Sequence, residues 1–284
     1  MPHTISGPAS MFDEVATTYD AIESHNLIFQ WQRRSVQNAA AETFDRRARL
    51  LEIGCGTGTD ALFFARRGNP VVALDPSAEM LAAAAEKIAL AGFAKTVAFK
   101  QANAEQLDGL VADYGPASFD GIFSNFGALN CVADMRPFAR AVATLLRPGG
   151  KVLLNLMPPI CPWEIFYFLL KVKPRAAFRR WRGRSGTQGL AVRLGNRRVQ
   201  TYYHSRRFVA TSFVPFFEIE KQLALGLFLP PPYLHAVARH QKIFNVLLNC
   251  EARLAGWPLL RNWGDHVVMI LRRCDNVEIN STPF

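Results

Sequence analysis

One short stretch of the chain, from Leu50 to Asp60, constrains the fold more than any other. It reads Leu-Leu-Glu-Ile-Gly-Cys-Gly-Thr-Gly-Thr-Asp, an apolar run that breaks into three glycines at alternate positions. An apolar run bounded by glycine is typical of a buried parallel strand. Gly54, Gly56 and Gly58 then allow the backbone to approach a ligand more closely than side chains would permit. The stretch therefore predicts a cofactor-binding loop between a strand and a helix.

The spacing of the glycines separates two kinds of cofactor. A dinucleotide fold has Gly-x-Gly-x-x-Gly, whereas here the third glycine comes one residue earlier and Glu52 lies two residues before the first. About twenty residues further on, a second apolar run, Val71–Leu74, ends in Asp75 and Pro76. A carboxylate at that strand end is placed to accept hydrogen bonds from a ribose diol. The alternative is the turn and strand end of any doubly wound α/β domain.

The combined pattern of acid-x-Gly-x-Gly-x-Gly and a strand-end acid resembles motif I of the class I S-adenosylmethionine-dependent methyltransferases. The resemblance implies an α/β fold with a doubly wound, Rossmann-like seven-stranded sheet, and S-adenosylmethionine as the cofactor. It also implies that Glu52 supports the glycine loop and that Asp75, with Pro76 beside it, binds the ribose. The residues that would cradle the cofactor are Gly54, Cys55, Gly56 and Gly58.

Further cofactor residues follow from the same resemblance. Asn103 and Ala104 stand where relatives commonly have Asp-Ala, so the Asn103 amide carbonyl would accept from the adenine amino group. Asn125 and Phe126 follow the predicted fourth strand, as in motif IV, and would lie between cofactor and substrate. Tyr19, in a Phe-Asp-x-x-Ala-x-x-Tyr-Asp stretch, would lie near the methionine part. Packing of an amphipathic helix is the alternative for Tyr19.

Strand-like and helix-like segments alternate after Arg49, which predicts a parallel sheet with ligands at the carboxyl ends of its strands. The expected strands are Leu50–Ile53, Val71–Leu74, Thr96–Lys100, Phe119–Ser124 and Lys151–Met157, then Phe216–Ala224 and Asp265–Arg273. The expected helices are Ser10–Ala41, Asp60–Arg67, Ala78–Ala91 and Asp134–Leu146.

This pattern divides the chain into a cofactor-binding core and extra segments. Insertions in such a fold lie over the strand ends, so we expect them to form a cap or lid over the substrate. The expected division is a helical cap segment at 1–45, the core at 46–157, a basic and aromatic lid insertion at 158–212, the last core strands at 213–229 and 265–273, a second helical insertion at 230–264, and a tail at 274–284.

Methyl transfer is an in-line displacement, so the protein must chiefly hold the nucleophile close to the methyl carbon. The aromatic residues of the insertions predict an apolar pocket, and hence a small apolar or aromatic substrate. We expect O-methylation first, with carbon and nitrogen acceptors open. A hydroxyl acceptor would benefit from a base, for which His204 and His235 are the candidates; packing or surface roles are the alternative for both. A cofactor-binding protein without turnover and an RNA methyltransferase are the other hypotheses.

The net charge of +10 is concentrated in one segment, because no acidic residue lies between Glu164 and Glu218 while twelve basic residues do. A solvated face, an anionic partner such as an acidic carrier protein, and a membrane surface contacted through residues 165–207 all remain open. Nucleic acid is weakly supported, because Pro230-Pro231-Pro232-Tyr233 lacks the preceding Asn or Asp of base-amino methyltransferases. Five scattered cysteines suggest neither disulfides nor a metal site. A cytoplasmic protein, with membrane-peripheral attachment as an option, is expected.

Overall fold

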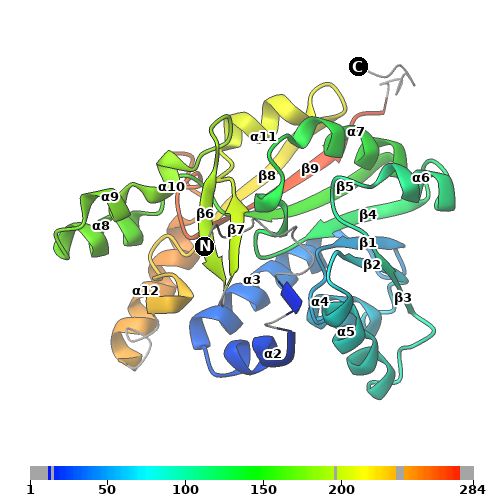
Figure 1. The fold of residues 1–284 in the computed structure, drawn as a ribbon, viewed down its shortest axis with the longest axis horizontal. Helices are drawn as coiled ribbons and strands as arrows, with labels where there is room; N and C mark the ends of the chain where they lie inside the picture. Colours follow the sequence, from blue (N-terminus) through cyan, green and yellow to red (C-terminus); the bar gives the residue numbers. More distant parts are fainter. Residues whose placement is uncertain (1–11, 14–15, 195–196, 235–239, 276–284) are drawn as a thin grey trace, which may run out of the picture.

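A seven-stranded sheet forms the centre of the molecule (Figure 1). The computed structural model describes residues 12–13, 16–194, 197–234 and 240–275. The strand order is β3-β2-β1-β4-β5-β9-β8. The strands span Leu50–Ile53 (β1), Val71–Asp75 (β2), Val97–Gln101 (β3), Phe119–Ser124 (β4), Leu146–Leu156 (β5), Phe217–Leu225 (β8) and His266–Arg273 (β9).

The direction of the strands gives the sheet a switch point between β1 and β4. Strand β1 pairs in parallel with β2 on one side and with β4 on the other, so chain connections leave it in both directions. Strand β9 runs antiparallel between β5 and β8. The predicted doubly wound fold with a reversed last strand is thereby confirmed. Strand β5 begins earlier than expected, because Leu146 already pairs with Phe119.

Helices cover both faces of the sheet (Figure 1). One layer consists of α3 (Leu27–Thr43), α4 (Thr59–Arg66) and α5 (Ala78–Leu90). The other consists of α6 (Asp108–Tyr114), α7 (Met135–Leu145) and α11 (Arg206–Phe213). The two faces of the sheet accordingly bury two separate hydrophobic clusters.

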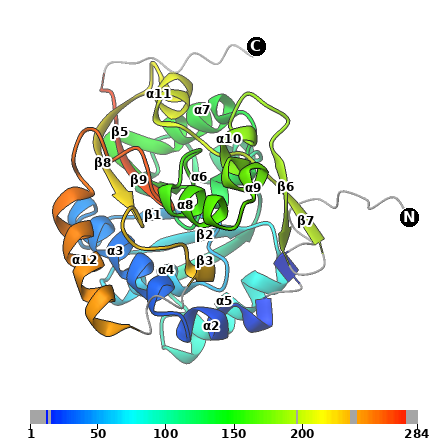
Figure 2. The same ribbon diagram turned by 90° about the vertical axis from the view of Figure 1, so that its left-hand side faces the viewer.

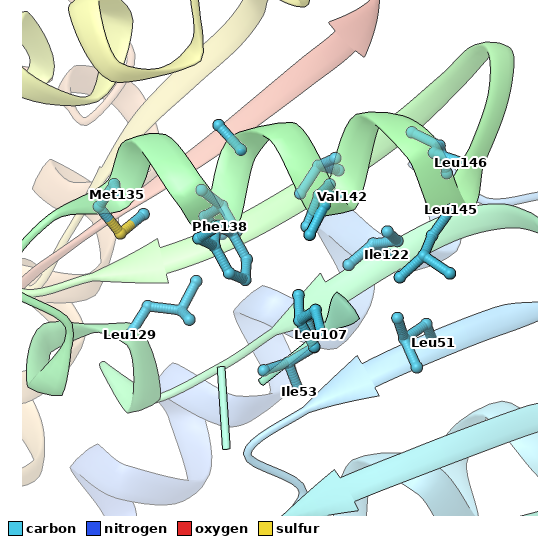
Figure 3. Close-up of a cluster of buried hydrophobic side chains, with 14 of the residues drawn as sticks. Leu51, Ile53, Leu107, Ile122, Leu129, Met135, Phe138, Val142, Leu145 and Leu146 are labelled. Carbon is cyan, nitrogen blue, oxygen red and sulfur yellow. The ribbon is translucent and has the colours of Figure 1, made fainter. Parts of the chain in front are cut away.

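Helix α7 shows how sequence spacing builds one of these layers (Figure 3). The Asp134 side chain caps the helix by accepting the N–H of Arg136. Apolar side chains then recur every three or four residues, at Met135, Phe138 and Val142, and point down onto the strands. All three are at most 2% exposed. Truncating Phe138 to alanine would cost about 3–5 kcal/mol of stability, because the site cannot collapse around the cavity.

The predicted N-terminal helix is two helices, α2 (Ala16–Ser24) and α3. The break follows from Asn26, whose side-chain carbonyl accepts the N–H groups of Ile28 and Phe29, each at 3.1 Å. An asparagine in this role starts a helix rather than continuing one. Residues 1–11, where the predicted helix was to begin, lie outside the described part.

Short helices and a hairpin make up much of the first inserted segment. It contains α8 (Pro162–Leu170), α9 (Pro174–Ala177), α10 (Arg179–Arg182) and an antiparallel hairpin of β6 (Leu190–Leu194) and β7 (Arg197–Thr201). The hairpin crosses the ends of the central strands (Figure 1). Helix α11, which closes the 158–212 segment, packs against α7 in the core layer.

The second inserted segment contains α12 (Gln241–Leu254), which places Phe244 against Ile28 of α3. Within the described ranges, no helix combines the length and apolar character that crossing a bilayer requires.

Candidate functional site

A cavity of about 260 Å³ opens at the carboxyl ends of β1, β2 and β4. This is the switch point of the sheet, where ligands of open α/β folds bind. Its walls combine residues from the loops after the strands with four residues of the β6–β7 hairpin. The lining includes Tyr19, Gly54, Gly56, Asp75, Pro76, Met80, Ala102, Asn103, Ala104, Glu105, Asn125, Phe126, Leu129, Asn130, Cys131, Met157, Val192, Arg193, Val199 and Thr201.

Two glycines of the loop after β1 adopt a left-handed backbone and border the cavity. Gly54 has φ +73°, and a Cβ there would come within 2.3 Å of the Ala128 Cβ. Gly56 has φ +51°, with no atom within 4 Å of the place where a Cβ would lie. A side chain is therefore excluded at Gly54 by crowding, whereas at Gly56 it would project into open space beside the cavity. That open space is the cradle predicted for a ligand.

Asp75 joins the glycine loop to the end of β2. Its Oδ2 accepts the N–H of Gly56 at 2.8 Å, and its Oδ1 accepts the N–H of Ser77 at 2.9 Å. Burial raises the pKa of this carboxyl, and the two N–H groups oppose that rise. Each carboxylate oxygen retains a further lone pair, so Asp75 can accept from both hydroxyls of a ribose while holding the loop.

The part of the cavity beside Asp75, here called the slot, is lined by apolar residues of α5 and of the loops after β2 and β3. Met80, Ala102 and Ala104 line it, together with Pro76. Asn103 also borders the slot, and its Oδ1 accepts the N–H of Glu105 at 2.8 Å. The second lone pair of this oxygen could accept a hydrogen bond from the amino group of an adenine. The predicted pair Asn103 and Ala104 thus lines the same cavity as Asp75, and its contact with the adenine stays a prediction.

Tyr19, Asn125 and Phe126 lie together at another part of the wall. The Asn125 Oδ1 accepts the Asn155 Nδ2 and the N–H of Phe126, both at 2.8 Å, and its Nδ2 donates to Asp60. The two bonds to Oδ1 shape the turn after β4, whereas Nδ2 has a second N–H that can donate to a ligand in the cavity. Phe126 stands in the left-handed region, with φ +48°. Burial raises the pKa of Tyr19 to about 12, so its hydroxyl remains protonated at neutral pH.

A buried ionic cluster supports this wall from behind. Arg33 of α3 binds both carboxylate oxygens of Glu23 and also Asp60, and its guanidinium lies 4.6 Å from the centre of the Phe126 ring. All three ionic side chains are buried. The sequence analysis missed the cluster. The one feature of the sequence that pointed to this cluster is Asp60, an acidic residue in the first turn of the helix after the glycine loop.

Three predicted loop residues lie outside the cavity lining. Glu52 is 2% exposed on β1, and burial followed by the charge of Asp60 raises the pKa of its carboxyl well above the usual range. Its Oε2 has no polar partner among the described residues. Cys55 is buried, and its N–H donates to the Leu74 carbonyl. Gly58 precedes α4 and donates its N–H to the Cys55 carbonyl.

His204, one of the two histidines proposed as bases, does not line the cavity. It is 1% exposed. Its Nε2 is 3.0 Å from the Leu129 carbonyl and must donate, so Nδ1 accepts from the Ser185 hydroxyl at 2.7 Å. Burial lowers the pKa of His204 to about 4. A histidine with both nitrogens engaged is a poor base, which argues against the predicted role. His235 lies outside the described residues.

The β6–β7 hairpin supplies lining residues that the sequence analysis did not anticipate, namely Val192, Arg193, Val199 and Thr201. The sequence does contain a pattern that predicts this hairpin. Two runs with alternating side chains, Leu190–Leu194 and Arg197–Thr201, flank Gly195-Asn196. A two-residue Gly-Asn connection between such runs is typical of a hairpin.

Comparison with known proteins agrees with this geometry. Residues 50–150 match a family model described as a methyltransferase domain. The Ubiquinone/menaquinone biosynthesis C-methyltransferase UbiE of Pectobacterium carotovorum subsp. carotovorum (strain PC1) is 31% identical over 159 residues, which cover 54% of this chain and 60% of that protein. The demethylmenaquinone methyltransferase of Beutenbergia cavernae is 29% identical over 174 residues, covering 58% and 64%. The match thus spans about 60% of the length of these curated relatives.

Solved structures extend the likeness of the fold to most of the chain. An S-adenosylmethionine-dependent methyltransferase from Mesorhizobium loti superposes with a TM-score of 0.52 at 18% identity, covering 83% of this chain and 96% of that one. The cyclase SpnF superposes with a TM-score of 0.62 at 16% identity, covering 96% and 98%. At these identities the superpositions speak for the fold alone.

The space beside Gly56, the Asp75 carboxylate and the apolar slot by Asn103 suit the parts of a nucleoside cofactor. The matched methyltransferase domain implies S-adenosylmethionine, which the name of the superposed Mesorhizobium loti methyltransferase also contains. The sheet order, the glycine loop and the family match agree that residues 50–150 form a methyltransferase domain, within a chain that has the class I methyltransferase fold.

Proposed function

We propose that this protein methylates a small, apolar, ring-containing molecule. The main support for the proposal is that a single cavity is lined both by Gly56 and Asp75, which are predicted to bind the cofactor, and by residues of the β6–β7 hairpin. Because the hairpin borders the same cavity, an acceptor held against it would lie close to the bound cofactor. Most of the lining is apolar, which favours an apolar acceptor.

Different residues of the cavity would bind the cofactor and the acceptor. Gly54 and Gly56 would cradle the cofactor, and Asp75 would hold its ribose. Tyr19 and Phe126 would border its sulfonium end, where S-adenosylmethionine supplies an electrophilic methyl group when bound. Met157, Val192 and Val199 would exclude water and hold the acceptor at attack distance. Positioning and desolvation are therefore the main contributions of the protein.

The lining favours carbon over oxygen as the acceptor atom. It contains no histidine among the described residues, and burial raises the pKa of Cys131 to about 11, as it raises that of Tyr19 to about 12. Neither group would accept a proton from a substrate at neutral pH. Of the two carboxylates among the described lining residues, Asp75 is assigned to the ribose, so Glu105 alone is left as a candidate base. An electron-rich ring carbon of a hydroxylated aromatic needs less help from a base than a neutral alcohol does. The names of the two curated relatives point the same way, one being a C-methyltransferase and the other acting on demethylmenaquinone.

The test uses methyl-labelled S-adenosylmethionine with a reduced demethylnaphthoquinone that carries a short isoprenoid tail. We expect label in the organic-soluble product, with NMR placing the methyl group on a ring carbon. An O-methyl signal in the NMR spectrum would instead support O-methylation. The Asp75→Ala variant should lose both cofactor affinity and product, because the loop and the ribose lose their shared acceptor.

A second experiment tests the proposal even if the chosen naphthoquinone is not the substrate. The same assay with a cell extract, separated into organic, aqueous, protein and nucleic-acid pools, should label the organic pool. Cofactor binding by calorimetry with no label in any pool would contradict the proposal and favour a binding protein. Label in the nucleic-acid pool, with a steep dependence on salt, would favour RNA.

A further inference from the structure

Helix α8 has its polar and apolar sides reversed relative to an ordinary surface helix. Its acidic residue, Glu164, is 1% exposed, whereas Phe166 is 59% and Leu170 is 67% exposed. A surface helix normally turns its apolar stripe toward the core and its charges toward water. The outward side of α8 is therefore suited to an apolar environment rather than to water.

The inward side of α8 is fixed by an ionic anchor. Glu164 accepts two hydrogen bonds from Arg179, at 2.7 and 3.0 Å, and one from Arg180 at 2.7 Å. Arg180 also binds the side chain and the carbonyl of Asp265, each at 2.7 Å. These contacts tie α8 and α10 to the start of β9. The apolar side of α8 consequently cannot turn inward without breaking a buried charge network.

Exposed apolar side chains also follow α8 in the sequence, at Val172 and Phe178 and on α10 at Trp181. We call the whole set the apolar platform, and it consists of Phe166, Leu169, Leu170, Val172, Phe178 and Trp181, which are 46% to 86% exposed. Helices α8 and α9 pack against each other and project together at one end of the molecule (Figures 1 and 2). Large apolar side chains left exposed on short helices that pack on one another indicate an interaction site.

Cations surround the platform and no acid accompanies them in the sequence. Lys171 and Lys173 are exposed on the turn between α8 and α9, and residues 165–217 contain no Asp or Glu. Beside them, arginines 175, 179, 182 and 193 line an open pocket. Apolar side chains interleaved with cations are the signature of elements that lie in the interface of an anionic bilayer.

We propose that the apolar platform docks on an anionic lipid bilayer, with Phe166, Leu170 and Val172 at the boundary between headgroups and acyl chains and Lys171 and Lys173 at the phosphates. A second copy of the chain fits less well, because two platforms would bring like charges together. The docking does not depend on which acceptor is methylated. It does bring the arginine-lined pocket, which shares Val192 and Arg193 with the cofactor cavity, toward the lipid.

The test is flotation of the full chain with vesicles of phosphatidylcholine, with and without phosphatidylglycerol. We expect association with the anionic vesicles that weakens in high salt and is much weaker with phosphatidylcholine alone. A variant combining Leu170→Asp with Val172→Asp should lower the vesicle-bound fraction at least about tenfold. The matched control is Leu90→Asp, because Leu90 is 83% exposed on α5, away from the platform.

A charge variant separates the two contributions to docking. Lys171→Gln with Lys173→Gln should reduce binding to anionic vesicles and remove most of its dependence on salt. All variants should keep the cofactor affinity of the parent, which verifies the fold. Failure of the parent to float with anionic vesicles would overturn the proposal. So would equal binding by the aspartate variant, or a dimer in solution that the aspartate variant abolishes.

Discussion

Asn130 and Tyr202 hold each other by two hydrogen bonds of 2.6 Å, one from the Asn130 Nδ2 to the Tyr202 carbonyl and one from the Tyr202 N–H to the Asn130 carbonyl. The Asn130 side chain also bonds the N–H of Met157 at 2.8 Å and its carbonyl at 3.0 Å. Asn130 is fully buried. One side chain thus joins the loop after β4, the end of β5 and the end of the hairpin.

Replacing Asn130 by alanine should therefore loosen the hairpin as well as lower stability. The N–H of Met157 and the carbonyl of Tyr202 would lose their partners, at about 1–3 kcal/mol for each buried group left unpaired. We expect a total loss of about 2–6 kcal/mol in urea unfolding, and faster amide exchange in residues 197–203. A loss of stability with unchanged exchange in the hairpin would contradict the proposed link. Lys95→Ala, on the surface between α5 and β3, is the control.

His204 gives a prediction about pH. Its folded-state pKa of about 4 lies below its ordinary value of 6.5 because burial disfavours the charged ring. Between these two values the unfolded chain binds a proton that the folded chain does not. Stability should therefore fall as the pH falls from 6.5 toward 4, with this one group contributing about 1.4 kcal/mol per pH unit.

Urea unfolding of the parent and of His204→Gln between pH 7.5 and pH 4 would measure this contribution. The variant should be less stable at pH 7.5, and its stability should depend less steeply on pH. A constant difference between the two proteins across the range would show that His204 is not held neutral. A catalytic base would instead change the pH profile of kcat/KM, which we expect the variant to leave intact.

The parts of the site that the sequence predicted are those made by local chain geometry. Gly54, Gly56 and Asp75 are identifiable because a loop that binds through its backbone requires glycine, and a strand-end acid follows a visible apolar run. Arg33 escaped notice because its partners, Glu23 and Asp60, lie on other helices, and nothing in a surface-like helical sequence distinguishes a buried arginine. His204 was predicted to be a base because histidine commonly accepts protons in active sites. In the structure its ring is buried and both nitrogens are hydrogen-bonded, which gives it a structural role.

The Arg33 cluster leads to a prediction about stability. Arg33→Met would leave the carboxylates of Glu23 and Asp60 buried without their cation, and breaking such a buried pair costs about 3–5 kcal/mol. The measurement is urea unfolding at neutral pH. Arg136→Met is the matched control, because Arg136 pairs with Asp134 on the surface, where water screens the interaction. Equal effects of the two substitutions would mean that the Arg33 cluster is not sealed from solvent.

Val199 tests which part of the cavity belongs to the acceptor. It is 7% exposed on β7 and lines the cavity, whereas the neighbouring Arg198 is exposed and, by the alternation of a strand, points to the opposite side. Val199→Phe should fill acceptor space and raise the KM for the acceptor by about tenfold or more, because a pocket responds strongly to added volume. Cofactor affinity, which depends on Gly56 and Asp75, should stay nearly constant. Arg198→Phe places the same bulk on the far side of the strand and should change neither quantity. If Val199→Phe weakened cofactor binding as much as acceptor binding, the hairpin would border the cofactor instead, and the acceptor would have to enter from another wall.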